Sequence, residues 1–371
     1  MVMGTARLDD VFKSISTTPH QPEPSKKKAF CIALTPTGRQ LKIVGDSPVE
    51  FIPFLADTDI AWIDFAVEEM SEAEKVAVSA GFISSLVPTL LGDYYSVYED
   101  LDTELGIRLP AVVGRKFDVN ITPLLILIRK NLILTIHGMG TTRLTRFSRY
   151  APTFLKKVDP KLSPPDKITI LLNRLIDENN NGNFDHLREI ESQGDDLSRA
   201  LLDAGASRES LAPDVYNMKH ALIAYLDSLW TTLDVISSLR YGDADLITDD
   251  KHLLGMFTIL ANDVNRQIAL GEHMSEVLAS GLEVLQSIYN NQLQVLNNKV
   301  SLLMAWLTVI GTAVLIPNTI ATIYGTPFFG DKGPEDLWWY VLLLLFSMVV
   351  SGYGTYWWMK RRDLMPRMPN I

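Results

Sequence analysis

This chain has one cysteine, fewer basic than acidic residues and no apolar run near its N-terminus. Each of these features excludes a class of protein. Cys31 is the single cysteine, so the chain cannot form an intrachain disulfide or a cluster of thiolate metal ligands. The formal net charge of −10 disfavours nucleic acid as a partner and suits cations instead. Residues 14–28 are polar and proline-rich, so we expect a mobile tail over 1–28 and no signal peptide.

Motifs for enzymatic chemistry are also missing. The sequence contains no recognisable pairing of a nucleophile with a base, no phosphate-binding loop and no metal motif of the kind that enzymes use. Its 6 histidines lack the spacing of zinc ligands, and His137 is expected simply to end a strand. We therefore predict a protein that is not an enzyme and holds no cofactor.

Charge is absent from two long stretches near the C-terminus. No charged residue occurs between Lys299 and Asp331, and none occurs between Asp336 and Lys360. Because about 20 apolar residues cross the hydrocarbon core of a bilayer, each stretch predicts one transmembrane helix. The lipid bilayer is therefore a predicted partner. We place the two helices at 301–324 and 337–359.

Basic and acidic residues predict how this pair of helices is oriented. The tail at 360–371 begins with Lys360 and Arg361, so the positive-inside rule places both ends of the pair, and hence both termini, in the cytoplasm. The loop at 325–336 would then be external. In an oligomer its acidic side chains would concentrate cations at the outer mouth; otherwise they form a solvated loop. These residues are Asp331, Glu335 and Asp336.

The first predicted span carries small and hydroxyl side chains along one stripe, whereas the second span is almost wholly apolar. At 100° per residue the stripe occupies an arc of about 100°. Two helices cannot enclose a water-filled path, so a pore would require an oligomer. The alternative is close helix packing, with each hydroxyl bonded to its own backbone. The stripe consists of Ser301, Met304, Thr308, Gly311, Thr312, Leu315, Thr319, Thr322 and Thr326.

Upstream of the membrane the pattern predicts an α/β domain followed by helices. Strand-like runs alternate with helical patterns before a mostly helical region at 165–240, and together they predict a domain at 29–245. From 246 to 300 apolar residues recur at three- and four-residue steps, which predicts a stalk helix continuous with the first span, about 70 residues in all. The predicted strands are 30–36, 61–67, 121–130 and 132–138, and the predicted helices are 71–95 and 140–156.

Several motifs resemble the CorA family of divalent cation channels, and the resemblance covers nearly the whole chain. The stretch around Trp62, Ile63 and Asp64 is similar to an early strand of that family. LIRKNLILTIHG, followed by Arg143 and Arg146, is similar to its central pattern. In the membrane part SLLMAWLT (301–308) is similar to NxxMxxLT, Pro317 and Thr319 to PxT, IYGTP (323–327) to IYGMN, and GPEDLWW (333–339) to the start of the second helix.

The resemblance implies an α+β membrane protein that forms a homopentameric funnel in the plasma or inner membrane. First helices would line the pore, second helices would surround them, and divalent metal ions, Mg²⁺ above all, would pass without ATP hydrolysis. It further implies a gate at Met304 and Leu307, with Gly311 and Leu315 further along the pore. Stalk carboxylates would hold regulatory cations; the candidates are Asp263, Glu272 and Glu276.

The chain departs from the family pattern in two places. Ser301 replaces an asparagine but keeps an oxygen, whereas Thr326 and Pro327 replace Met-Asn, so the amide implied to contact hydrated Mg²⁺ is absent. The remaining predicted filter comprises Tyr324, Gly325, Thr326 and Pro327, with carbonyl and hydroxyl oxygens that suit a hydrated cation. Two alternatives stay open: a transporter of Zn²⁺ or another transition metal, including a proton-coupled one, and a non-conducting scaffold or sensor.

One further segment resembles a calcium loop. DENNNGNFDHLRE (177–189) nearly fits the pattern D-x-N-x-N-G, but Arg188 occupies the position of the closing glutamate. The segment is therefore either a helix end without metal or a weak cation site. Its candidate ligands are Asp177, Asn179, Asn181 and Asp185.

Overall fold

A computed structural model describes residues 28–92, 97–202, 208–242, 244–324 and 337–362. The chain divides into two compact units, Met1–Leu278 and Ala279–Ile371. The first contains an α/β domain with further helices, and the second contains two apolar helical segments. The fold class predicted from the sequence, an N-terminal α/β domain followed by a long helix and a C-terminal helix, is confirmed.

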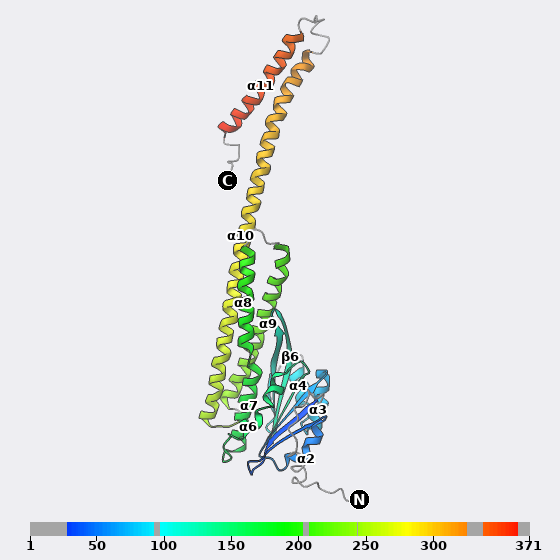
Figure 1. Ribbon diagram of the computed structural model, residues 1–371, viewed down its shortest axis with the longest axis vertical. Coiled ribbons are helices and arrows are strands. Elements are labelled where there is room, and N and C mark those ends of the chain that lie inside the picture. Colours follow the sequence, from blue (N-terminus) through cyan, green and yellow to red (C-terminus); the bar gives the residue numbers. More distant parts are fainter. Residues whose placement is uncertain (1–27, 93–96, 203–207, 243, 325–336, 363–371) are drawn as a thin grey trace. The chain divides into compact units, whose positions relative to one another are not determined.

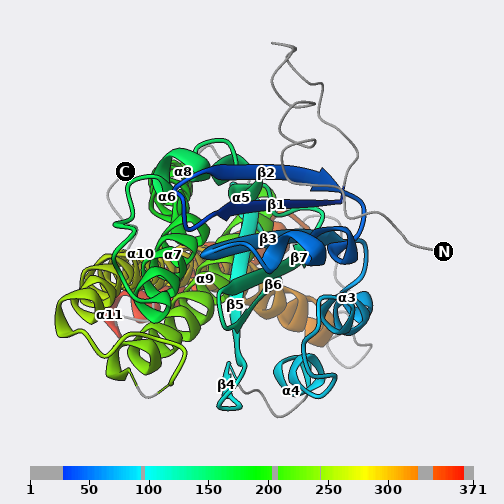
Figure 2. The ribbon, with the colours of Figure 1, turned by 90° about the horizontal axis from the view of Figure 1, so that it is seen from below.

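The described residues of the first unit form a seven-stranded sheet in the order β2-β1-β3-β7-β6-β5-β4 (Figure 2). β3 and β7 pair in parallel, and the other neighbours pair antiparallel. Buried apolar runs such as that of β3 explain why the central strands form. The strands are β1 (Ala29–Leu34), β2 (Gln40–Gly45), β3 (Ile60–Val67), β4 (Tyr98–Asp100), β5 (Leu105–Arg115), β6 (Asp118–Arg129) and β7 (Leu132–Gly138).

Helices cover both faces of this sheet (Figure 2). α3 (Ala73–Ser79) and α4 (Leu86–Leu91) share a buried cluster with alternate residues of β3, among them Ile63 and Phe65. On the other face Trp62 packs against Phe147 with ring centroids 5.1 Å apart. This alternation is the two-residue period of a strand buried on both faces. The helices of the second face are α5 (Arg143–Phe147), α6 (Ala151–Leu155), α7 (Pro164–Asn180), α8 (Asn183–Leu202) and α9 (Arg208–Tyr241).

Two predicted helices are each divided in the structure. The single helix expected at 71–95 is wrong, because α3 ends where Gly81 adopts a φ of +92°, a conformation that a continuing helix cannot include. The helix expected at 140–156 is likewise replaced by α5 and α6, and Pro152 stands in the first turn of α6. Strands β2, β4 and β5 were not predicted.

α10 (Lys251–Tyr324) is one uninterrupted helix of 74 residues, as the stalk pattern predicts (Figure 1). α11 (Leu337–Arg361) is the second long apolar helix. Both contain windows that are long and apolar enough to cross a membrane.

Within the second unit α10 and α11 pack through small residues and hydrogen bonds. Ala305 and Val309 of α10 form a buried cluster with Met359 of α11. A Cβ added at Gly352 would lie 3.3 Å from the Cβ of Ala313, so glycine permits the close approach of the two helices.

Candidate functional site

One face of α10 in the second unit is turned away from α11. Met304, Leu307 and Leu315, the predicted gate and pore residues, have 65%, 70% and 63% of their surface exposed. Ala305 and Val309, on the side that packs against α11, have 6% and 8% exposed. The other exposed members of the predicted stripe are Ser301, Thr308, Gly311, Thr319 and Thr322. The structure therefore brings the stripe together on an open helix face, which is where an oligomer or lipid would meet it.

The hydroxyls of the stripe are bonded to their own helix. Thr308, Thr319 and Thr322 donate to the carbonyl oxygens of the fourth residue before each, at 2.9, 2.9 and 2.8 Å. This is the bonding that the packing alternative expects. Because the backbone already satisfies these hydroxyls, they suit a lipid-facing surface as well as a water-filled path, and they do not distinguish the two.

Thr312 lies at the edge of the stripe, toward α11. It is half-buried, and its hydroxyl donates to Thr355 of α11 at 3.1 Å. Ser351 of α11 in turn donates to the Thr312 carbonyl at 2.9 Å. These contacts give Thr312 a part in helix packing.

The predicted filter and the acidic external loop lie outside the described residues. This applies to Gly325, Thr326 and Pro327, to the side chain of Tyr324, and to the acidic residues Asp331, Glu335 and Asp336.

The calcium-like segment spans the end of α7, the two-residue turn that follows and the first turns of α8. Asp177 lies in the last turn of α7 and pairs with Arg174 at 2.9 Å. The side-chain amide of Asn179 donates to the Pro110 carbonyl of β5 at 3.0 Å, so it points toward the sheet. Asp177 and Asp185 line two different cavities. The helix-end interpretation of this segment agrees with that placement.

Two predicted cation ligands that lie far apart in the sequence line a smaller cavity of about 240 Å³. Asp177 of the α7 end and Asp263 of α10 both line it, within the first unit. Burial and the neighbouring charges of Glu178 and Asp263 raise the pKa of Asp177, although Arg174 partly opposes them. Two neighbouring carboxylates can attract a cation, although each is paired with an arginine in the structure. The remaining lining residues are Asn180, Asn181, Gly182, Phe184, Arg266 and Gln267.

Gln267 adds an unused ligand atom to this cavity. Its side chain is 6% exposed, and its Oε1 is buried with no hydrogen-bond partner among the described residues. Sequence reasoning missed Gln267, because a glutamine on an amphipathic helix carries no signal until its burial is known. Arg266 pairs with Asp263 and competes with a cation for that carboxylate. Glu272 and Glu276, the other stalk candidates, are exposed.

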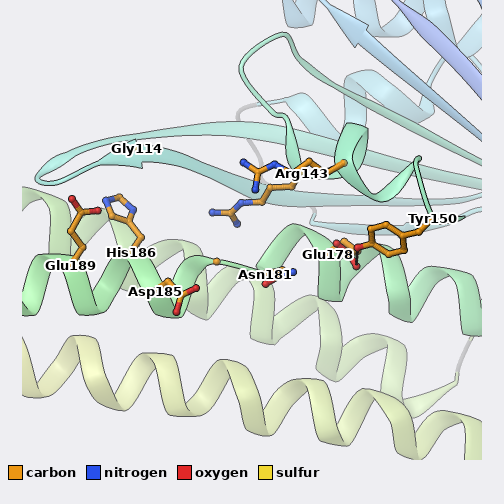
Figure 3. Close-up of a pocket in the computed structure, with 10 residues that line it drawn as sticks. Gly114, Arg143, Tyr150, Glu178, Asn181, Asp185, His186 and Glu189 are labelled. Carbon is orange, nitrogen blue, oxygen red and sulfur yellow. Dashed lines mark hydrogen bonds between the residues drawn. The ribbon is translucent and has the colours of Figure 1, made fainter. Parts of the chain in front are cut away.

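A larger cavity of about 500 Å³ lies between the β5–β6 hairpin, α5 and the α7–α8 turn (Figure 3). Most of its polar groups hold these elements together. Arg143 donates to the Asn179 carbonyl and to Asn183 Oδ1, and Glu178 accepts hydrogen bonds from Tyr150 and Arg174. The His186 ring donates to the Lys116 carbonyl at 2.9 Å and accepts from the Tyr225 hydroxyl at 2.7 Å. We interpret this cavity as structural.

A buried charged pair joins the two parallel strands at the centre of the sheet. His137 Nε2 lies 3.2 Å from Asp64 Oδ2, and Nδ1 donates to the Gly138 carbonyl at 2.8 Å. Thr135 donates to Asp64 at 2.5 Å and accepts from Trp62 Nε1 at 3.0 Å. Burial opposes the charged form of His137, but the Asp64 charge, its hydrogen bond and the Gly138 carbonyl outweigh burial and raise the pKa of His137.

This pair was not predicted, although His137 does stand one residue before the end of β7. The register of β3 and β7 could have indicated it. Asp64 lies opposite Thr135, and His137 is two residues after Thr135, on the same face of the sheet. The pair is enclosed, and neither residue lines a described cavity, so we interpret it as serving the fold.

Comparisons of the sequence with known proteins find relatives over most of the chain. A family model described as "CorA-like Mg2+ transporter protein" matches residues 57–361. The cobalt/magnesium transport protein CorA of Methanocaldococcus jannaschii is 26% identical over 302 residues, covering 80% of this chain and 90% of the relative.

Solved structures share the fold. The complete CorA magnesium transporter of Methanocaldococcus jannaschii has a TM-score of 0.64 at 21% identity, covering 89% of this chain and 98% of the other. The full-length CmaX protein has a TM-score of 0.54 at 16% identity, covering 92% and 99%.

Proposed function

Because the chain belongs to the CorA-like Mg²⁺ transporter family, we propose that it conducts a divalent cation, Mg²⁺ first among them, down its electrochemical gradient. The conducting form is a homopentamer in which α10 lines the pore and α11 lies outside. Neither described helix can enclose a path alone, since a helix pair has no interior wide enough for hydrated ions. Both termini lie in the cytoplasm, and the host membrane is the plasma or inner membrane. The protein performs no enzymatic step.

The observation that carries this proposal is the open face of α10. Three large apolar residues, Met304, Leu307 and Leu315, are each at least 63% exposed on the side opposite α11. Five such faces around an axis would bury these residues against one another. Rings of apolar side chains close a pore to ions by excluding water, so Met304 and Leu307 form the gate of the proposed channel.

Flux through purified full-length protein tests the proposal. Liposomes containing the protein should take up Mg²⁺ faster than empty liposomes, and a panel of Zn²⁺, Ni²⁺, Co²⁺ and Na⁺ gives the selectivity. Preference for Zn²⁺, or uptake that requires a proton gradient, would support the transition-metal alternative. If no ion is taken up faster than by empty liposomes, the transport proposal is refuted and the non-conducting scaffold or sensor is the alternative that remains.

The filter hypothesis is tested separately at Pro327. The Pro327→Asn variant supplies the amide that the chain lacks. A changed ion preference is expected if position 327 faces the ion. An unchanged preference would show that selection occurs elsewhere in the pore.

Regulation by intracellular cation is the second part of the proposal, supported by the cavity that Asp177 and Asp263 share. Divalent cations prefer oxygen ligands, and two carboxylates with the free Gln267 oxygen supply them. Mg²⁺ inside the liposomes should reduce flux, and Asp263→Asn should weaken that inhibition. Asp234→Asn makes the same chemical change at an exposed position of α9 that lines neither cavity, so it is the matched control and should leave inhibition unchanged.

A further inference from the structure

Asn318 is a polar residue on the open face of α10. It lies on the exposed side, one helical turn after Leu315 and one turn before Thr322, and Val309, which packs on α11, is about 180° away around the helix. Its backbone carbonyl accepts the Thr322 hydroxyl at 2.8 Å. Its side-chain amide has no hydrogen-bond partner among the described residues.

This amide differs from every hydroxyl around it. Between Leu302 and Ile323, all of which the structure describes, each threonine hydroxyl has a partner: Thr308, Thr319 and Thr322 donate within α10, and Thr312 contacts both carbonyls of α10 and Thr355 of α11. The backbone of a helix leaves no free N–H for a mid-helix asparagine, and its carbonyls are bonded except that of Ala313, to which Pro317 cannot donate. No bond from Asn318 to that carbonyl is formed between these two described residues. A free amide placed in hydrocarbon loses its hydrogen bonds with water, at a cost of about 4–8 kcal/mol on the strictest scale.

The open face therefore has to meet water or another polar group at the level of Asn318. The hydroxyls make no such demand, because their bonds are already formed. Asn318 is thus the residue of this span that distinguishes a water-lined face from a lipid-facing one.

We propose that Asn318 forms the polar ring of the pore, in which a carboxamide from each subunit contacts a hydrated divalent cation through its water shell. The inference rests on the proposed function and assigns it a selecting residue. The ring lies about 9 Å before the end of α10. It supplies the neutral amide that Thr326 and Pro327 do not provide.

The chemistry of the amide suits this task. Water bound to a divalent cation is a strong hydrogen-bond donor, and the amide oxygen accepts from it without displacing it, which matters because Mg²⁺ sheds water reluctantly. A neutral ring also holds the ion weakly enough to release it, as conduction requires.

Thiol accessibility in the full-length protein tests where Asn318 faces. Cys31 is the single cysteine and is 2% exposed, and burial raises its pKa to about 12, so the native chain offers no reactive thiolate. The Asn318→Cys variant should react with a charged, membrane-impermeant thiosulfonate in proteoliposomes. Phe346→Cys, at a position of α11 that is 67% exposed, is the lipid-facing control and should not react. Failure of the Asn318→Cys variant to react would overturn the proposal.

Flux tests whether Asn318 selects the ion. Asn318→Leu should reduce divalent uptake at least tenfold. Asn318→Gln should keep it, and Asn318→Thr, whose hydroxyl can bond to its own helix, should reduce it as leucine does. Asn298→Leu makes the same chemical change on α10 at a position about 200° around the helix and should be neutral.

The outcomes separate the two proposals. Absent flux in the wild-type protein refutes the proposed function, while the thiol reaction still decides whether Asn318 faces water. Normal wild-type flux that leucine and threonine both leave unchanged, with the same ion preference, overturns the inference alone. If the leucine variant does not assemble, the threonine variant decides the matter.

Discussion

Replacing Asp64 with asparagine should weaken the α/β domain in a way that depends on pH. The substitution keeps the size of the side chain but removes the negative charge that faces His137 at 3.2 Å. Both partners are buried, with 4% or less of either side chain exposed. The variant therefore leaves a histidine that can be charged only by placing an unpaired cation inside the protein.

The magnitude follows from that burial. Removing one partner of a buried charged pair costs about 3–5 kcal/mol. His137 can shed its proton, which limits the loss to about 3 kcal/mol, or roughly 6–12 °C in Tm for a domain of this size.

The sign of the pH dependence is fixed by the pKa of His137. In the wild type that pKa is raised, so its contribution is fully present below the pKa of an unfolded histidine and is lost as pH rises through the raised value. In the variant burial acts without the Asp64 charge and lowers the pKa, so low pH destabilises. The Tm difference between wild type and variant should therefore be largest near pH 5.5 and shrink toward pH 8.5.

Thermal unfolding of the full-length protein in detergent, followed by tryptophan fluorescence across this range, measures the difference. Asp57→Asn, at an exposed position just before β3, is the matched control and should shift Tm little. A difference that does not change with pH, or that grows as pH rises, would refute the assignment of a charged His137.

Three further substitutions test the packing of the fold. Gly106→Ala should cost about 1–3 kcal/mol, because the added Cβ would lie 2.8 Å from two leucine side chains of α4; an unchanged Tm would contradict that packing. Asp166→Ala removes the capping box of α7 and a hydrogen bond from Thr248, and should cost about 1–2 kcal/mol. The Thr248 hydrogen bond chiefly lowers the pKa of Asp166, so this loss should be seen in Tm at neutral pH and disappear as pH falls through the lowered pKa; a loss that persists in acid would contradict it. Ser351→Ala removes the hydrogen bond to the Thr312 carbonyl and should cost only about 0.6 kcal/mol, so a large fall in the thermal stability of the assembled protein would refute this estimate.

The sequence predicted those elements whose pattern is local. β3 and β7 are nearly continuous apolar runs, and α10 has no proline before Pro317, so both kinds of element follow from composition and period. β5 was missed because Gly106, Arg108 and Pro110 interrupt its apolar residues, and it is a strand only because β6 pairs with it along its whole length.

The sites were less predictable, because they depend on residues that lie far apart in the chain. Asp177 and Asp263 were each predicted as candidate cation ligands, yet nothing in the sequence indicated that α7 and α10 bring them to one cavity. The helical period predicted the hydroxyl stripe. It did not predict that the threonine hydroxyls are already hydrogen-bonded to backbone carbonyls and so have no need of water. Asn318 was not predicted, because it lies outside the hydroxyl stripe and at the variable position of the Pro317–Thr319 motif.

Uptake of Mg²⁺ into liposomes at a series of membrane potentials tests the central proposal most directly. If the protein conducts passively, uptake should rise steadily as the interior becomes more negative, since moving each elementary charge through 100 mV releases about 2.3 kcal/mol. The rise should be at least tenfold smaller with the Asn318→Leu variant and unchanged with Asn298→Leu. Uptake by the wild-type protein that equals that of protein-free liposomes at every potential would contradict the account.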